Sequence, residues 1–285
     1  MNPNREHKNS VFTALFKDKE ALLELYNALT DSDLPPDTEI EITTLQGILF
    51  LDAMNDISFL LEGRIVLLIE HQSSISENTP LRLLLYVSRV YEKLVDKRSV
   101  YRQKLLKVPT PELIVLYNGK ASFPEQKTLK LSDAFIEAPK RDGSMGSLEL
   151  EVQVLNINAG YNEEILNRSE NLSGYVAFID KIREYTNEGM ELGEAIALAV
   201  KHCEANNILQ PFLSKHASEV ENMLTTEFVM ADAIEVWKEE GREEGLEEGR
   251  EEGMRAVLSL LESGKTVEEI KAAIGLGLNL VEERA

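Results

Sequence analysis

The sequence is poor in cysteine and has no long apolar run, and both shortages exclude whole classes of protein. Cys203 is the single cysteine among 285 residues, which excludes an internal disulfide framework, and no CxxC motif or Cys/His cluster indicates zinc. No uninterrupted apolar stretch approaches the length of a membrane span, and the first eight residues are polar, unlike a secretory signal. We therefore expect a soluble, cytoplasmic protein with no membrane partner.

The chain is strongly acidic overall, but its basic residues are concentrated in one window. A formal net charge of −20 argues at first against a nucleic-acid partner, because phosphate binding needs clustered cations. From Pro80 to Lys130, however, eleven Lys and Arg residues stand against four acids, a local net charge of +7. Because the local field governs ligand attraction, this window is compatible with nucleic acid.

The N-terminal half alternates between helical and extended patterns. Ser10 is a candidate N-cap for the first helix, Lys17 marks a break in it, and Glu62-Gly63 predicts a tight turn between two strands. The expected elements are, in order, a helix at 11–29, strands at 39–51, from Asp56 and at 65–69, a helix from Pro80 to about Lys104, and a strand at 113–117. This order predicts an α/β fold with a mixed sheet flanked by helices.

The C-terminal half is mostly helical and contains a low-complexity tail. A strand is expected at 148–157 and helices over 161–230. From residue 240 to 253 glycine recurs at every fourth position among Glu and Arg, and each glycine costs a helix roughly 1 kcal/mol relative to Ala. We therefore expect a partner chain to stabilise this tail in a homo-oligomer, with a dimer favoured. The predicted parts are a core at 1–160, a helical subdomain at 161–237 and an acidic tail at 238–285.

Three polar residues at strand ends carry the strongest chemical signal. Asp56 begins one predicted strand, and Glu70 and Gln72 directly follow the apolar run of the next. Two carboxylates that meet at a sheet end suit Mg²⁺ or Mn²⁺, which keep several waters for chemistry. The alternative is that both acids are ordinary solvated strand-end residues. Polar groups that continue a buried strand need a reason, however, and this favours the metal site.

A basic stripe is expected on the helix that follows these residues. Its members recur at helical spacing and are Arg82, Tyr86, Arg89, Lys93 and Lys97. We expect the stripe to flank the metal end of the sheet and to contact DNA phosphates. The alternative is a solvated helix face, and Tyr86 either stacks on a base or packs in the core.

Several short motifs carry a family resemblance. The segments Leu22-Leu23-Glu24-Leu25-Tyr26-Asn27, Asn55-Asp56-Ile57-Ser58-Phe59 and Ile69-Glu70-His71-Gln72-Ser73 resemble the recombination-promoting nuclease (Rpn) family of transposase-like proteins. Further similar segments are Asn78-Thr79-Pro80-Leu81-Arg82, Tyr117-Asn118-Gly119, Asn156-Ile157-Asn158 and the Glu-Gly-Arg tail. The element order with Asp…Glu-x-Gln resembles the PD-(D/E)XK nuclease superfamily, to which that family belongs.

The resemblance implies a Mg²⁺-dependent bacterial DNA endonuclease connected with recombination, mobile elements or phage defence, built on a restriction-endonuclease-like core. In this sequence Asp56 and Glu70 would hold the metal together with the backbone carbonyl of His71. Glu24 matches an extra acid near the metal, or is a surface helix residue. Gln72 stands where the superfamily usually has Lys, and an amide can donate hydrogen bonds but supplies no positive charge.

Two other functions remain open from the sequence. One is a catalytically weak or inactive DNA-binding or regulatory relative, in which Gln72 in place of Lys leaves the core with little or no catalytic activity. The other is an oligomeric scaffold that acts through its helical tail. Metal-dependent cleavage distinguishes the nuclease from the first, and the effect of tail deletion on assembly distinguishes the second.

Overall fold

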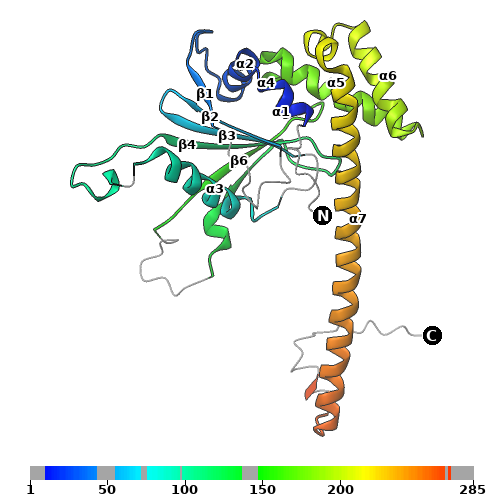
Figure 1. The fold of residues 1–285 in the computed structure, drawn as a ribbon. Helices are drawn as coiled ribbons and strands as arrows, with labels where there is room; N and C mark the ends of the chain where they lie inside the picture. The colour runs from blue at the N-terminus through cyan, green and yellow to red at the C-terminus, as the bar shows by residue number, and fades with distance from the viewer. Residues whose placement is uncertain are drawn as a thin grey trace, which may run out of the picture. The chain divides into compact units, whose positions relative to one another are not determined.

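A computed structural model describes most of the chain (Figure 1). The described residues are 10–43, 55–71, 76–96, 98–136, 147–266 and 269–270, and within them the side chains of 55–56, 68–71, 217–218, 226–227, 229–241, 243–244, 248 and 251–252 are not described. The elements are α1 (Val11–Leu15), α2 (Lys19–Thr30), β1 (Ile40–Ile42), β2 (Asn55–Leu61), β3 (Arg64–His71), α3 (Thr79–Leu94), η1 (Ser99–Tyr101), β4 (Thr110–Tyr117), β5 (Gln126–Lys130), η2 (Leu131–Ala134), β6 (Glu151–Asn156), α4 (Glu163–Arg168), α5 (Glu170–Asn187), α6 (Leu192–Ala205) and α7 (Gln210–Glu262).

The strands form one mixed sheet in the order β1-β2-β3-β4-β6-β5. Strands β3, β4 and β6 run parallel, whereas β1–β2, β2–β3 and β5–β6 are antiparallel pairs. The expected α/β fold with a mixed sheet is therefore confirmed. Strand β5 has no counterpart among the predicted elements, because its sequence, Gln-Lys-Thr-Leu-Lys, is polar apart from one leucine.

Local sequence explains several element boundaries. Ser10 caps α1 in a capping box with Thr13, and the Asp18 carboxylate caps α2 after the break that Lys17 predicts. Glu62 and Gly63 both have positive φ, 45° and 77°, as a two-residue type I′ hairpin turn between β2 and β3 requires. The predicted early helices and hairpin are confirmed.

The helix α3 begins near Pro80 as expected, but it ends at Leu94 rather than near Lys104. Val95 is extended, and the Asp96 carboxylate accepts hydrogen bonds from the backbone N–H and the hydroxyl of Ser99. This local side-chain bonding stabilises a turn in competition with the helix. The predicted length was wrong because helical periodicity continues past this turn.

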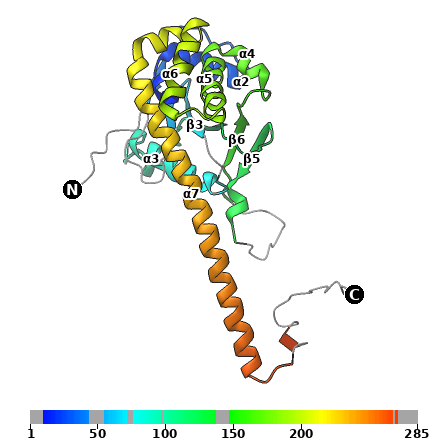
Figure 2. The same ribbon diagram turned by 90° about the vertical axis from the view of Figure 1, so that its right-hand side faces the viewer.

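Helices cover both faces of the sheet. Figures 1 and 2 show α2, α4 and α5 on one side and α3 on the other. The α5 face includes the buried side chains of Val66, Ile114 and Leu116, and the α3 face those of Ile65, Leu67 and Val115. These alternating residues give β3 and β4 two apolar faces, as expected of central parallel strands.

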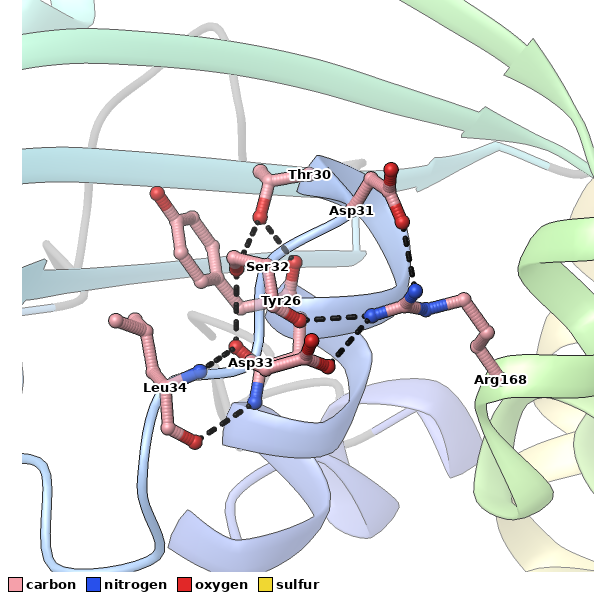
Figure 3. Close-up of polar contacts among 8 residues, drawn as sticks. Tyr26, Thr30, Asp31, Ser32, Asp33, Leu34 and Arg168 are labelled. Atoms are coloured by element: carbon pink, nitrogen blue, oxygen red, sulfur yellow. Dashed lines mark hydrogen bonds and ion pairs between the residues drawn. The ribbon is translucent and has the colours of Figure 1, made fainter.

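Arg168 connects α4 to the end of α2 (Figure 3). Its Nη1 lies 2.6 Å from Asp31 Oδ1, and its Nη2 lies 3.0 Å from Asp33 Oδ1 and donates to the Ser32 carbonyl at 2.8 Å. Both aspartates are almost fully exposed, so each ion pair contributes at most about 1 kcal/mol to the free energy of unfolding.

The chain divides into two compact units, Met1–Ala231 and Asp232–Ala285. Residues expected to form a separate helical subdomain instead pack in the same core as the sheet. Phe178, Ile196 and Leu213 are fully buried in the apolar cluster that includes Phe59 and Leu116. The observed division therefore lies within α7, and the first unit shows no break at residue 160.

Candidate functional site

The predicted site lies where the carboxyl ends of the parallel strands meet. We call this end of the sheet the carboxyl edge. Asp56 lies at the Glu70 end of the β2–β3 hairpin, as expected, but it is the Cα partner of Ile69. The Cα partner of Glu70 is Asn55. Residues in register share a face of a regular antiparallel pair, so the register is offset by one residue from a direct Asp56–Glu70 pair.

Part of the predicted site lies outside the described residues. The structure does not describe Gln72 and Lys97. It describes only the backbone of Asp56, Glu70 and His71. Among the described side chains, no three His, Cys, Asp or Glu residues lie together as metal ligands. The side chains of Asp56 and Glu70 are not among those described, so their role stays a prediction.

Three asparagines extend this edge across β4 and β6. His71 is in register with Tyr117, the residue before Asn118, and Tyr117 is in register with Asn156. The Asn156 amide donates to the Phe123 carbonyl at 3.0 Å, and its Oδ1 accepts the backbone N–H of Asn158 at 3.1 Å. Asn118 and Asn156 are essentially fully buried.

Arg183, on α5, binds two of these asparagines. Its Nη1 donates to Asn118 Oδ1 at 2.9 Å and to Asn158 Oδ1 at 3.1 Å, and its Nη2 donates to the Asn118 carbonyl. Only 15% of the Arg183 side chain is exposed. The guanidinium therefore joins α5 to the ends of β4 and of the segment after β6.

The negative charge nearest to Arg183 among the described residues is that of Asp180, whose Oδ1 lies 3.4 Å from Nη1. Burial raises the pKa of Asp180, although Arg183 and the backbone N–H of Ala159 act in the opposite direction. Two buried donors at this edge, Asn118 Nδ2 and Arg183 Nε, have no hydrogen-bond partner among the described residues. Such donors are uncommon in folded proteins, because each costs roughly 1–3 kcal/mol.

Gly119 is required by the packing of this edge. A Cβ at this position would lie 2.6 Å from the ring atoms of Tyr117. The Tyr117 hydroxyl donates to the Ala121 carbonyl at 2.8 Å, which fixes the ring over the glycine. The Tyr117-Asn118-Gly119 motif thus shapes the turn that presents Asn118.

Asn118 and Asn158 lie in motifs that carry the family resemblance, but the sequence alone indicates no role for them or for Arg183. Asn118 and Asn156 each follow an apolar strand, the same signal that drew attention to Glu70. Arg183 carried no such signal, since it is one polar residue of an amphipathic helix and lies 65 positions from Asn118.

The carboxylate of Glu24 binds the first turn of α5. Its Oε1 accepts the backbone N–H of Asn171 at 3.1 Å, and its Oε2 accepts the Asn171 side-chain amide at 2.9 Å. Asn171 lies in the first turn of α5, about 18 Å along the helix from Arg183. Glu24 therefore connects α2 to the N-terminus of α5, and its predicted place beside the metal stays a prediction.

The members of the basic stripe differ in burial along α3. Tyr86 is fully buried in the core on the α3 face, which favours packing over base stacking, the two alternatives that the sequence left open. Arg82 lies in the first turn, nearest to the end of β3, and burial lowers its pKa from the ordinary value. Arg89 is exposed and pairs with Glu92 at 2.9 Å, and Lys93 is exposed in the last turn.

The remaining basic residues of the window lie partly at the opposite end of the sheet. The Tyr91 hydroxyl donates to the Pro109 carbonyl at 2.6 Å, beside the start of β4, and Thr110 is in register with Arg64. A cavity of about 640 Å³ opens there, lined by Tyr91, Val95, Leu105 and Arg102 among others. The positive charge is therefore not confined to the end of the sheet where the metal site is predicted.

Comparison with known protein families identifies the family of this chain. The model of the family described as "Putative transposase, YhgA-like" matches residues 52–207, more than half of the chain. The chain belongs to this family. The match spans β2 to α6 and confirms the resemblance to Rpn-type, transposase-like proteins. Searches of curated proteins and of solved structures found no match.

Among the helices that the structure describes, none is both long and apolar enough to cross a bilayer. The family region includes the whole asparagine edge and Arg183. The α7 helix and its glycine-rich segment lie after it.

Two residues of the predicted metal site lie at this edge by their backbone positions. The hairpin brings the backbones of Asp56 and Glu70, two residues with carboxylates, to neighbouring positions on adjacent strands. Oxygen donors are what Mg²⁺ and Mn²⁺ prefer.

Proposed function

We propose that this chain is a Mg²⁺- or Mn²⁺-dependent DNA endonuclease with a PD-(D/E)XK-like centre at the carboxyl edge of its sheet. The proposal is supported by the β2–β3 hairpin, which brings the backbones of Asp56 and Glu70 to the same end of two adjacent strands, one residue out of direct register. Family membership supports a role in DNA processing and mobile elements.

The residues have distinct tasks in this proposal. Asp56, Glu70 and the carbonyl of His71 would hold the ion, which when bound polarises a phosphodiester oxygen and supplies a hydroxide for attack. Gln72 orients water or phosphate by hydrogen bonds alone. Arg82, at the start of α3, contributes positive charge near the scissile phosphate, whereas Arg89 and Lys93 contact more distant phosphates along the duplex.

Plasmid nicking tests the proposal. Purified protein with Mg²⁺ should convert supercoiled plasmid to nicked or linear forms, and Asp56→Ala and Glu70→Ala should each lower the rate by at least about 100-fold. EDTA should abolish cleavage. Equal rates for all three proteins would exclude these residues as the centre. Salt-sensitive DNA binding without any metal-dependent cleavage would favour a non-catalytic DNA-binding relative.

A second function, assembly through the tail, is favoured by the surface of α7. Leu246, Met254, Leu258 and Leu261 are all at least 48% exposed. A Cβ at Gly245, Gly249 or Gly253 would have no heavy atom within 4 Å, so this side of the helix is open among the described residues. An exposed apolar and glycine surface on a helix suits close packing with a second copy of the same chain.

Light scattering tests the assembly role. The full chain should have the mass of a dimer or a higher oligomer, and deletion of 238–285 should reduce it to a monomer. Identical monomeric masses would exclude tail-mediated assembly. Replacing the three glycines by Ala should raise helicity in either case, but it should weaken association only if a partner helix packs against the glycines.

A further inference from the structure

The connection between α3 and β4, residues 95–109, has no part in the proposed nuclease centre. Together with the last turns of α3 it lines the cavity of about 640 Å³, which we call the α3–β4 groove. We propose that this groove binds helix α7 of a second copy of the chain through Met254, Leu258 and Leu261. The inference rests on the proposed assembly through the tail, because it names the surface that receives the tail. It does not depend on the nuclease.

The groove has an apolar lining that is open to solvent. Val100, Leu105 and Leu106 belong to it, and they are 61%, 83% and 40% exposed. Figure 1 shows the α3–β4 connection extending away from the body of the sheet. Large apolar side chains that gather on one exposed surface indicate a binding partner.

The charge of the groove is positive. Residues 95–109 carry five Lys and Arg residues against one acid, a local net charge of +4. Arg102 and Lys104 line the groove, are exposed, and form no ion pair with a described carboxylate. Glu92, the acidic residue of the described lining, is paired with Arg89 at 2.9 Å. The groove therefore favours an acidic partner.

The tail offers the complementary surface. Met254, Leu258 and Leu261 follow a spacing of four and then three residues, which places them on one face of α7. Each is at least 48% exposed. Residues 238–285 carry seven Lys and Arg residues against thirteen acids, a net charge of −6. An apolar row on an acidic helix thus matches an apolar groove with a basic rim.

The groove and the row also agree in length. The α3 side of the groove runs from Ser88 to Val95, and the row runs from Met254 to Leu261. Each spans seven residues, about 10 Å along a helix. Two copies that exchange their tails form this contact twice, which gives a closed symmetric dimer.

Duplex DNA is the other anionic partner that this surface could attract. Its phosphates would pair with Arg102 and Lys104, but the exposed side chains of Leu105 and Leu106 would bury little apolar area against a phosphate backbone. A helix with an apolar row and acidic flanks uses both the cations and the leucines. The observations therefore favour the tail of a second copy.

Sedimentation equilibrium of the full chain tests the contact. Leu105→Asp in the groove and Leu258→Asp in the row should each raise the Kd of self-association at least about 10-fold, because each places a charge where an apolar side chain is buried. The controls are Ile136→Asp, 95% exposed and outside the groove, and Ser259→Asp, exposed on another face of α7. Both controls should associate like the wild type. All four residues are exposed, so melting temperatures should stay near that of the wild type.

Mixing the two variants distinguishes groove binding from direct pairing of two tails. Leu105→Asp retains an intact row, and Leu258→Asp retains an intact groove, so a mixed pair keeps one of the two contacts that neither variant forms alone. The mixture should therefore contain dimers at concentrations where each variant is monomeric. A mixture that stays monomeric would overturn the exchange of tails. If Leu105→Asp folds poorly, Val100→Asp, at a second exposed position of the lining, takes its place.

The remaining outcomes separate this inference from the proposed functions. Wild-type association in Leu105→Asp, with monomers after deletion of 238–285, would overturn the groove contact and leave assembly through the tail intact. Wild-type association with weaker duplex binding in Leu105→Asp would assign the groove to DNA, and would also overturn it. A monomeric wild-type protein would overturn both the groove contact and the assembly, whereas plasmid nicking would be unaffected.

Discussion

Asn55 and Glu70 are Cα partners across the β2–β3 hairpin, and Asp56 is one residue out of register with Glu70. Two polar residues, Asn55 and Asp56, therefore begin β2 opposite the end of β3, at the proposed metal site. Because Asp56 and Asn55 differ in charge, only the carboxylate is a strong ligand for a hard cation.

This relationship gives the first prediction. Asp56→Ala should abolish Mg²⁺-dependent nicking, whereas Asn55→Ala should retain at least about a tenth of the wild-type rate, since an amide is a weak Mg²⁺ ligand. Initial rates of plasmid nicking measure both. The reverse ranking would assign the site to the residue in register with Glu70.

Glu24 is predicted to act through stability rather than chemistry. Glu24→Ala should lower the free energy of unfolding by roughly 1–2 kcal/mol, because the first-turn N–H of Asn171 loses its acceptor. Urea denaturation measures this loss. Nicking per folded molecule should be unchanged, and a drop of 100-fold at full folding would restore Glu24 to the metal site.

Arg82 and Arg89 should differ in their effect on catalysis. Each Arg→Ala change should weaken duplex binding and reduce its salt dependence, because each removes one phosphate contact. Only Arg82→Ala should also lower the cleavage rate at saturating DNA, since Arg89 lies about 10 Å farther along α3. Single-turnover rates at saturation distinguish the two, and equal rates for both variants would contradict the assignment.

Cys203 provides a pH-dependent prediction. Burial raises the pKa of its thiol to about 11, above the ordinary value of 9.0. The folded state retains this proton at pH values where the unfolded state loses it, so stability should fall as pH rises from about 9 to 11. Cys203→Ala should show a smaller decline over that range in urea titrations.

Thiol labelling gives an independent check of the same residue. In native protein at pH 8 the buried thiol should react with an aromatic disulfide reagent only as fast as the protein unfolds. Rapid stoichiometric labelling without denaturant would contradict the burial. The same assay reports whether the variants described above are folded.

Local sequence signals predicted the fold where neighbouring residues determine it. The Ser10 cap, the break at Lys17 and the Glu62-Gly63 turn all have short-range causes. The end of α3 was missed because one carboxylate, that of Asp96, stabilises a turn within a continuing helical pattern.

The candidate site was predictable only in part. The carboxylates and their hairpin follow from short-range pattern, but Tyr86 appeared to belong to a basic stripe because periodicity does not specify how wide the buried face is. Arg183 and Asn118 meet through tertiary packing of α5 on the sheet. No spacing along the sequence encodes that contact.

Anomalous scattering from a crystal soaked in Mn²⁺ tests the central claim most directly. The account predicts a peak about 2 Å from carboxylate oxygens of both Asp56 and Glu70. A protein that cleaves DNA in Mn²⁺ but shows no peak at those two residues would contradict it.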